Sequence, residues 1–186
     1  MTYQPPGYPP YQQPTYRPMP PQPLSPGGQP LADFGSRLLA YLLDGLIVGG
    51  AAMVVALPVF FIVFFSMLDT TAEAPETGAF IGRILLLEVG LLAVLLVGHY
   101  FYYVEMIYRS GQTVGKKVAK VRVVPIDPSV RMTRGIAAKR FLAHIVAGTV
   151  IPFYSYLDGF WQLWDKPYLQ TLHDKFAQTV VVKVSP

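Results

Sequence analysis

The stretch that decides the fold is Gly45 to Leu68, which reads GLIVGGAAMVVALPVFFIVFFSML and contains no charged residue. A helix rises about 1.5 Å per residue, so this stretch is long enough to cross a hydrocarbon core of about 30 Å. Pro58 lies inside it and is expected to kink the helix, which neighbouring helices can accommodate. The sequence therefore predicts a transmembrane helix over residues 38–68.

A second apolar run covers residues 84–104 and ends in the aromatic cluster Tyr100 to Tyr103. Aromatic side chains gather at membrane interfaces, so this run predicts a second span. The connection 69–82 holds three acids and no base, whereas nine of the fifteen lysines and arginines lie between Arg109 and Arg140. By the positive-inside rule we expect the loop 105–140 and the N-terminus in the cytoplasm, and the connection 69–82 outside.

A third hydrophobic segment, residues 141–164, contains Gly148, Pro152, Asp158 and Gly159. It is either a poor third span or a hairpin that turns near Pro152. The hairpin is favoured because it keeps the C-terminal lysines on the basic side and allows the strand-like segments 121–124 and 179–184 to pair there. The fold class predicted is an α-helical membrane protein with two full transmembrane helices, a third hydrophobic hairpin or span, and a small cytoplasmic strand pair.

Residues 1–30 form a distinct region that carries eleven of the eighteen prolines. A segment with so little apolar content cannot offset the entropy of ordering, so we expect a disordered cytoplasmic tail. Pro5-Pro6-Gly7-Tyr8 has the shape of a ligand for an aromatic groove. Composition alone produces such four-residue patterns, so disorder without a specific ligand role is the favoured interpretation.

Nothing in the composition indicates an enzyme, and no cofactor is expected. The absence of cysteine excludes thiolate metal sites and thiol nucleophiles. His144 and His173 have no partner at metal-ligand spacing, so no metal site is predicted. The loop GQTVGKK, residues 111–117, has three residues between its glycines and no Ser or Thr after the lysine, unlike a phosphate-binding loop.

The bases of this loop are instead expected to face anionic lipid headgroups, where each contributes about 1 kcal/mol. This lipid-facing set is Lys116, Lys117, Lys120 and Arg122. The clustering of bases in one loop between two hydrophobic segments is explained by contact with a membrane surface. Nucleic-acid binding is not expected.

Two ionisable residues lie in the first span. Arg37 is expected to anchor its end at the interface, with Asp33 one turn earlier as a partner. Asp44 lies about 10 Å further in, where a carboxylate costs about 2.5 to 3.5 kcal/mol unless it is paired, protonated or facing water. It is either a working carboxylate or a hydrogen-bonding link between helices. His99 lies at about the same depth in the second span, so it is the expected intramembrane partner of Asp44.

Several short motifs that are separated along the chain occur together in a characteristic order. They are Phe34-Gly35-Ser36-Arg37 leading into Leu43-Asp44, GQTVGKKVAKVRVV from Gly111 to Val124, Arg140, and TLHDKFAQTVVV from Thr171 to Val182. Over residues 32–184 this pattern resembles the RDD family of bacterial integral membrane proteins, named for one arginine and two aspartates. By that resemblance Arg37, Asp44 and Asp174 are the family residues.

The resemblance implies a multi-pass protein of the bacterial inner membrane that is involved in transport of a small ion or solute. Two or three spans can hardly enclose a pathway, so we expect a homo-oligomer or a larger membrane complex in the lipid bilayer. The alternative is a non-transporting scaffold that docks lipids or a partner through its basic loop.

Overall fold

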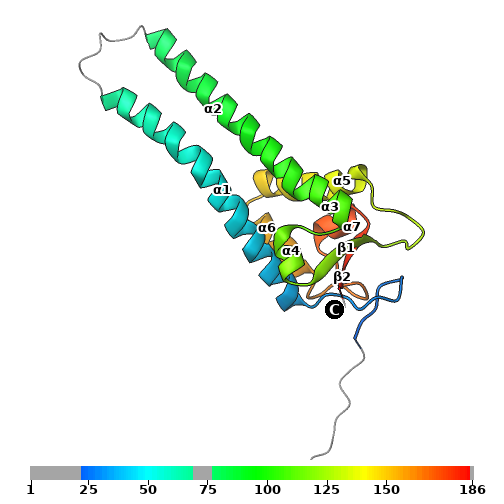
Figure 1. Ribbon diagram of the computed structural model, residues 1–186. Coiled ribbons are helices and arrows are strands. Elements are labelled where there is room, and N and C mark those ends of the chain that lie inside the picture. The colour runs from blue at the N-terminus through cyan, green and yellow to red at the C-terminus, as the bar shows by residue number, and fades with distance from the viewer. Residues whose placement is uncertain (1–21, 69–76, 185–186) are drawn as a thin grey trace, which may run out of the picture.

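Two long helices form an arm, and the other residues that the structure describes gather into a head at one end of it (Figure 1). The computed structural model describes residues 22–68 and 77–184. Helix α1 is Phe34–Leu68, and α2 is Thr77–His99. Helix α2 continues through a π-helical turn, η1 (Tyr100–Glu105), into α3 (Met106–Ser110). Over the described residues, two continuous helices of 35 and 33 residues are long and apolar enough to cross a membrane.

The arm exposes its apolar side chains to its surroundings. Leu46 is 75% exposed on α1 and Leu86 is 74% exposed on α2. The buried residues of α1 are Arg37, Ala40 and Asp44, all near the end that enters the head. Helices that are apolar all round are stable only when an apolar medium covers them, which is the condition that a bilayer provides.

Two short strands form the centre of the head. Strand β1 (Val121–Pro125) pairs antiparallel with β2 (Thr179–Lys183), with Val123 opposite Val181. Val123 and Val181 pack with Val104 and Ile107 from the end of the second long helix. Strands of five residues gain little stability from pairing alone, so this apolar packing holds the pair against the arm.

The segment before α1 adds to the same sheet edge. Leu31 bridges Val182 of β2, and the Leu31 amide donates to the Pro23 carbonyl at 2.9 Å. Leu31 is 3% exposed. The expectation that disorder extends to residue 30 is therefore wrong for residues 22–30, because backbone hydrogen bonds to a strand edge order a proline-rich segment that has no core of its own. The rest of the predicted tail, residues 1–21, lies outside the described residues.

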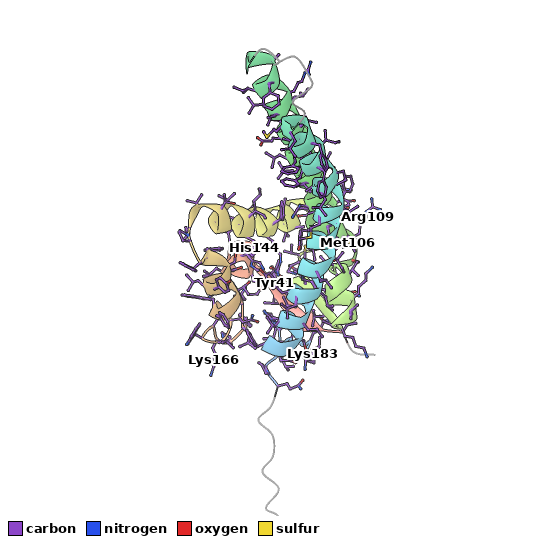
Figure 2. All side chains as sticks on the ribbon, turned by 90° about the vertical axis from the view of Figure 1, so that its left-hand side faces the viewer. Tyr41, Met106, Arg109, His144, Lys166 and Lys183 are labelled. Carbon is purple, nitrogen blue, oxygen red and sulfur yellow. The ribbon has the colours of Figure 1, made fainter. Side chains whose placement is uncertain are left out.

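The third hydrophobic segment contains two helices. Helix α5 (Arg134–Val150) ends before Pro152, and α6 (Tyr154–Trp161) follows Phe153, whose φ is 61°. At 17 residues, α5 is shorter than the about 20 residues that a span needs. Figure 2 shows α5 extending sideways from the arm, roughly at right angles to the long helices. Helix α6 lies below the outer end of α5 in that view.

Two further short helices complete the head. Helix α4 (Val114–Val118) lies in the basic loop and contacts α1. Helix α7 (Leu172–Phe176) precedes β2 and contacts α5 and α6. The start of α1, the basic loop and the C-terminal strand therefore all lie at the same end of the arm (Figure 1).

Candidate functional site

The Asp44 carboxylate lies at the junction of the arm and the head and accepts four hydrogen bonds. Its Oδ1 accepts from the Tyr102 hydroxyl at 2.7 Å and from the Gly115 amide at 2.8 Å. Its Oδ2 accepts from the Thr113 hydroxyl at 2.6 Å and from the Lys116 ammonium at 3.1 Å. Asp44 is only 2% exposed. A buried carboxylate is costly unless its lone pairs are satisfied and its charge is paired, and this arrangement meets both conditions.

The loop sequence explains how this contact is made. Thr113 is the N-cap of α4, which turns the first amides of that helix toward Asp44. A Cβ at Gly115 would lie 2.5 Å from the Ala40 carbonyl oxygen and 2.6 Å from Asp44 Oδ1, so only glycine permits this approach. The GQTVGKK loop therefore binds an anion, but the anion is a carboxylate of the same chain.

Lys116 is the cationic partner in this cluster. Its side chain is 17% exposed. Burial lowers the pKa of the Lys116 ammonium, and the Asp44 carboxylate opposes that effect by favouring the charged form. Burial alone would favour the neutral form of Lys116, and the Asp44 carboxylate favours its charged form.

Two expectations about these residues are wrong. His99 does not contact Asp44; its Nδ1 lies 2.8 Å from the Leu95 carbonyl oxygen on its own helix. Equal depth places two residues in one layer of the membrane, but the rotation of the helix decides which side chain faces inward, and here Tyr102 does. Lys116 points inward to Asp44 rather than toward lipid, because Gly115 brings the loop against α1. The other three members of the lipid-facing set are exposed: Lys117, Lys120 and Arg122.

Arg37 and Asp174 lie together in a second cluster, at the start of α1. Arg37 Nη1 is 3.5 Å from Asp174 Oδ2. The Arg37 guanidinium also donates to backbone carbonyls of Leu169 at 2.7 Å and Val181 at 3.1 Å. The expected pairing of Arg37 with Asp33 is wrong, since the Asp33 carboxylate binds Lys183 at 2.7 Å instead. Arg37 therefore ties α1 to the C-terminal strand.

Arg140 of α5 completes this second cluster. It forms an ion pair with Asp174 and donates to the Thr179 hydroxyl at 2.9 Å. Burial and the nearby Arg37 charge lower the pKa of Arg140 to about 9. Asp174 is fully buried, and it also closes the capping box of α7 with Thr171. Of the three RDD-type residues, the structure brings Arg37 and Asp174 together and leaves Asp44 two turns away with other partners.

Asp158 of α6 gathers the two remaining histidines, which sequence spacing did not connect. Its Oδ2 lies 3.0 Å from His144 Nδ1 and 2.5 Å from His173 Nδ1. Spacing along the sequence gives neither histidine a partner, because the three residues come from three helices that meet only in the folded chain. The signal available in the sequence was the presence of two ionisable residues, His144 and Asp158, within the apolar segment 141–164.

The charges of this third cluster follow from its burial. Burial, together with the nearby charge of Arg140, lowers the pKa of His173 to about 3, so its ring is neutral at pH 7. The close contact to Asp158 is therefore a hydrogen bond from a neutral ring. Burial raises the pKa of Asp158, but the hydrogen bonds from His144 and His173 outweigh that effect and hold it well below its usual range.

Comparison with protein families gives a match that spans the part of the chain where these clusters lie. The chain matches the model of the RDD family over residues 31–178, a region that includes Arg37, Asp44 and Asp174. No curated protein and no solved structure matches the chain. The matched region covers most of the chain, and the two long apolar helices lie within it. The chain is therefore a membrane protein that belongs to the RDD family.

Proposed function

We propose that this protein takes part in the transport of a small cation or solute, with the Asp44 carboxylate and the Lys116 ammonium as the exchange site. The observation that carries the proposal is an ion pair, at the head end of a membrane span, enclosed by hydroxyl groups. Lys116 Nζ lies 3.1 Å from Asp44 Oδ2 and 3.4 Å from Thr113 Oγ1. Ionisable residues inside spans commonly belong to ion or proton pathways.

The chemistry of exchange follows from the atoms around the ammonium. Carboxylate and hydroxyl oxygens are the ligands that hard cations prefer, and Asp44, Thr113 and Tyr102 supply them here. Lys116 occupies this set as an internal cation. Because burial lowers its pKa, loss of its proton is favoured relative to a solvated lysine, and the freed carboxylate can then accept a proton or a cation.

Two spans do not enclose a pathway, so the proposal includes a homo-oligomer or a larger membrane complex. The positive-inside rule places the head, with its excess of bases, in the cytoplasm of a bacterial cell. The N-terminus then lies in the cytoplasm as well, because α1 begins in the head.

The test is ion flux into liposomes that contain the purified full chain and a trapped pH-sensitive dye, under an imposed sodium or potassium gradient. Asp44→Asn is expected to abolish flux, because asparagine can neither exchange a proton nor pair with Lys116. The asparagine amide group would also face the four hydrogen-bond donors that surround Asp44, which can destabilise the fold. Lys116→Gln is therefore a second variant, which leaves the carboxylate in place. Asp127→Asn, at an exposed loop aspartate, is the matched control.

Normal flux in both Asp44→Asn and Lys116→Gln would refute the carboxylate mechanism. Wild-type flux equal to that of empty liposomes under both the sodium and the potassium gradient would refute transport by this chain alone and favour a complex or the scaffold described next.

A second candidate function is a non-transporting scaffold, and one observation favours it. Two clusters join distant segments of the chain to α1, as a structural role requires. One is formed by Arg37, Asp174 and Arg140, and the other is centred on Asp44. The exposed Lys117, Lys120 and Arg122 then remain on the head for anionic lipid. For this candidate, replacing the three exposed bases with glutamine should weaken binding of the detergent-solubilised protein to vesicles rich in anionic lipid, while Asp44→Asn should change that binding little.

A further inference from the structure

The cluster of His144, Asp158 and His173 has the composition of a transition-metal site. One donor atom from each residue lies within 4.8 Å of the donor atoms of the other two. The contacts from Asp158 Oδ2 are shorter, at 3.0 Å to His144 Nδ1 and 2.5 Å to His173 Nδ1. Ligands at about 2.0 to 2.2 Å from a tetrahedral zinc ion stand about 3.3 to 3.6 Å apart, so small side-chain rotations convert this cluster into a coordination shell.

The three ligands are fixed by three different helices. His144 comes from α5, Asp158 from α6 and His173 from α7. The Asp158 Oδ1 accepts from the His173 backbone amide at 3.0 Å, which orients the carboxylate while leaving Oδ2 toward the two rings. The imidazole planes are inclined at 74° with centroids 5.4 Å apart, so the rings approach the carboxylate from different directions. A carboxylate that is itself hydrogen-bonded is the usual arrangement for a metal ligand.

Burial gives this cluster a closed base and an open side. Asp158 is 1% exposed, whereas the side chains of His173 and His144 are 16% and 31% exposed. An ion can therefore reach the histidines from outside and meet the carboxylate behind them. Figure 2 labels His144 on α5.

The charge around the cluster is compatible with a cation. Imidazole binds a metal in its neutral form, so two imidazole ligands with one carboxylate would bring one negative charge to the ion. Arg140 lies one helical turn before His144 on α5, and its guanidinium forms an ion pair with Asp174, which is not one of the three ligands. The ligand set, two histidines with one carboxylate, suits zinc or ferrous iron, and leaves at least one coordination position open.

We propose that His144, Asp158 and His173 form a binding site for a divalent transition-metal ion of the zinc type. The ion joins the α5–α6 pair to α7, the helix that carries Asp174. This site is separate from the Asp44 cluster, and its test does not depend on transport.

The experiment is titration of the purified full chain in detergent, first treated with a chelator, with Zn²⁺ by calorimetry and with Co²⁺ by absorption spectroscopy. One ion per chain is expected, with d–d bands in the Co²⁺ complex and a higher unfolding temperature on addition of Zn²⁺. His144→Gln and His173→Gln should each weaken binding by more than the about 10- to 100-fold that loss of an outer-shell partner costs. His99→Gln is the matched control and should bind as the wild type does, because His99 lies in the second span outside this cluster.

Two results would overturn the proposal. One is the absence of stoichiometric Zn²⁺ binding by the wild type, which would leave the three residues as a hydrogen-bonded link between helices. The other is binding that His144→Gln and His173→Gln leave unchanged. His144 is the most exposed of the three ligands, so His144→Gln is the variant that disturbs the buried part of the head least.

Discussion

The Lys116 ammonium lies 3.1 Å from the Asp44 carboxylate, although 72 residues separate the two in the chain. The contact joins the basic loop to the first transmembrane helix at the head end of the arm. Asp44 accepts from Tyr102, Thr113 and Gly115 at the same time, so α1, the end of the second long helix and the loop meet at a single carboxylate. This junction determines how the head is attached to the arm.

Replacing Gly115 with alanine should break this junction. The added Cβ would lie 2.5 Å from the Ala40 carbonyl oxygen, which belongs to a helix backbone and cannot easily move. Overpacking of this kind costs about 1 to 3 kcal/mol, and loss of the Gly115 hydrogen bond adds to it. A lower unfolding temperature of the purified protein in detergent is the expected result.

Gly45→Ala is the matched control for this prediction. Gly45 lies in the interior of α1 with open space around it, so alanine should leave stability unchanged or raise it by up to about 1 kcal/mol. Equal unfolding temperatures for Gly115→Ala and the wild type would contradict the close approach of the loop to α1.

Removing the Asp174 carboxylate should destabilise the head strongly. Asp174→Ala leaves the guanidinium groups of Arg37 and Arg140, with side chains only 7% and 12% exposed, without their carboxylate. Breaking a buried pair from one side costs about 3 to 5 kcal/mol. Unfolding in denaturant should show the loss, whereas Asp127→Ala, which removes only exposed hydrogen bonds from Ser129, should cost about 1 kcal/mol or less. A small effect for Asp174→Ala would show that the two arginines are satisfied by their other partners, which are backbone carbonyls for Arg37 and the Thr179 hydroxyl for Arg140.

Two truncations should separate the tail from the head. Deletion of residues 2–21 should leave insertion and stability intact, because their proline-rich composition offers no apolar surface for a core. Deletion of residues 2–31 also removes Leu31 and its bridge to Val182 at the sheet edge. Loss of one buried leucine costs about 2 to 5 kcal/mol, so only the longer deletion should lower the amount of folded protein in the membrane. Protein recovered in the detergent-soluble membrane fraction would measure both.

Reporter fusions should place the two ends of the arm on opposite sides of the membrane. Fusions after Asp127 and after Pro186 should both report the cytoplasm, since β1 and β2 pair in one head and the bases cluster there. A fusion at Glu76, in the acidic connection between the long helices, should report the outside. If the fusion at Pro186 alone moved to the outside, the third hydrophobic segment would have to span, and the pairing of β1 with β2 would be impossible.

The sequence by itself determined the two long helices and the family. Hydropathy over Gly45 to Leu68 depends only on residues that are neighbours in the chain, and so does the length needed to cross a bilayer. Family motifs are likewise local runs of sequence. Arg37, Asp44 and Asp174 could therefore be selected from the sequence as the family residues, but their partners could not.

Only the tertiary structure decided those partners. Depth along a helix can be counted from the sequence, but the rotation of the helix is set by packing, so Tyr102 rather than His99 reaches Asp44. The close approach at Gly115 turns Lys116 inward, while Lys117 next to it stays exposed. His144, Asp158 and His173 lie on three helices and meet only when the head folds. Contacts of this kind join segments that are distant in the chain, and no local pattern of hydropathy or charge encodes their geometry.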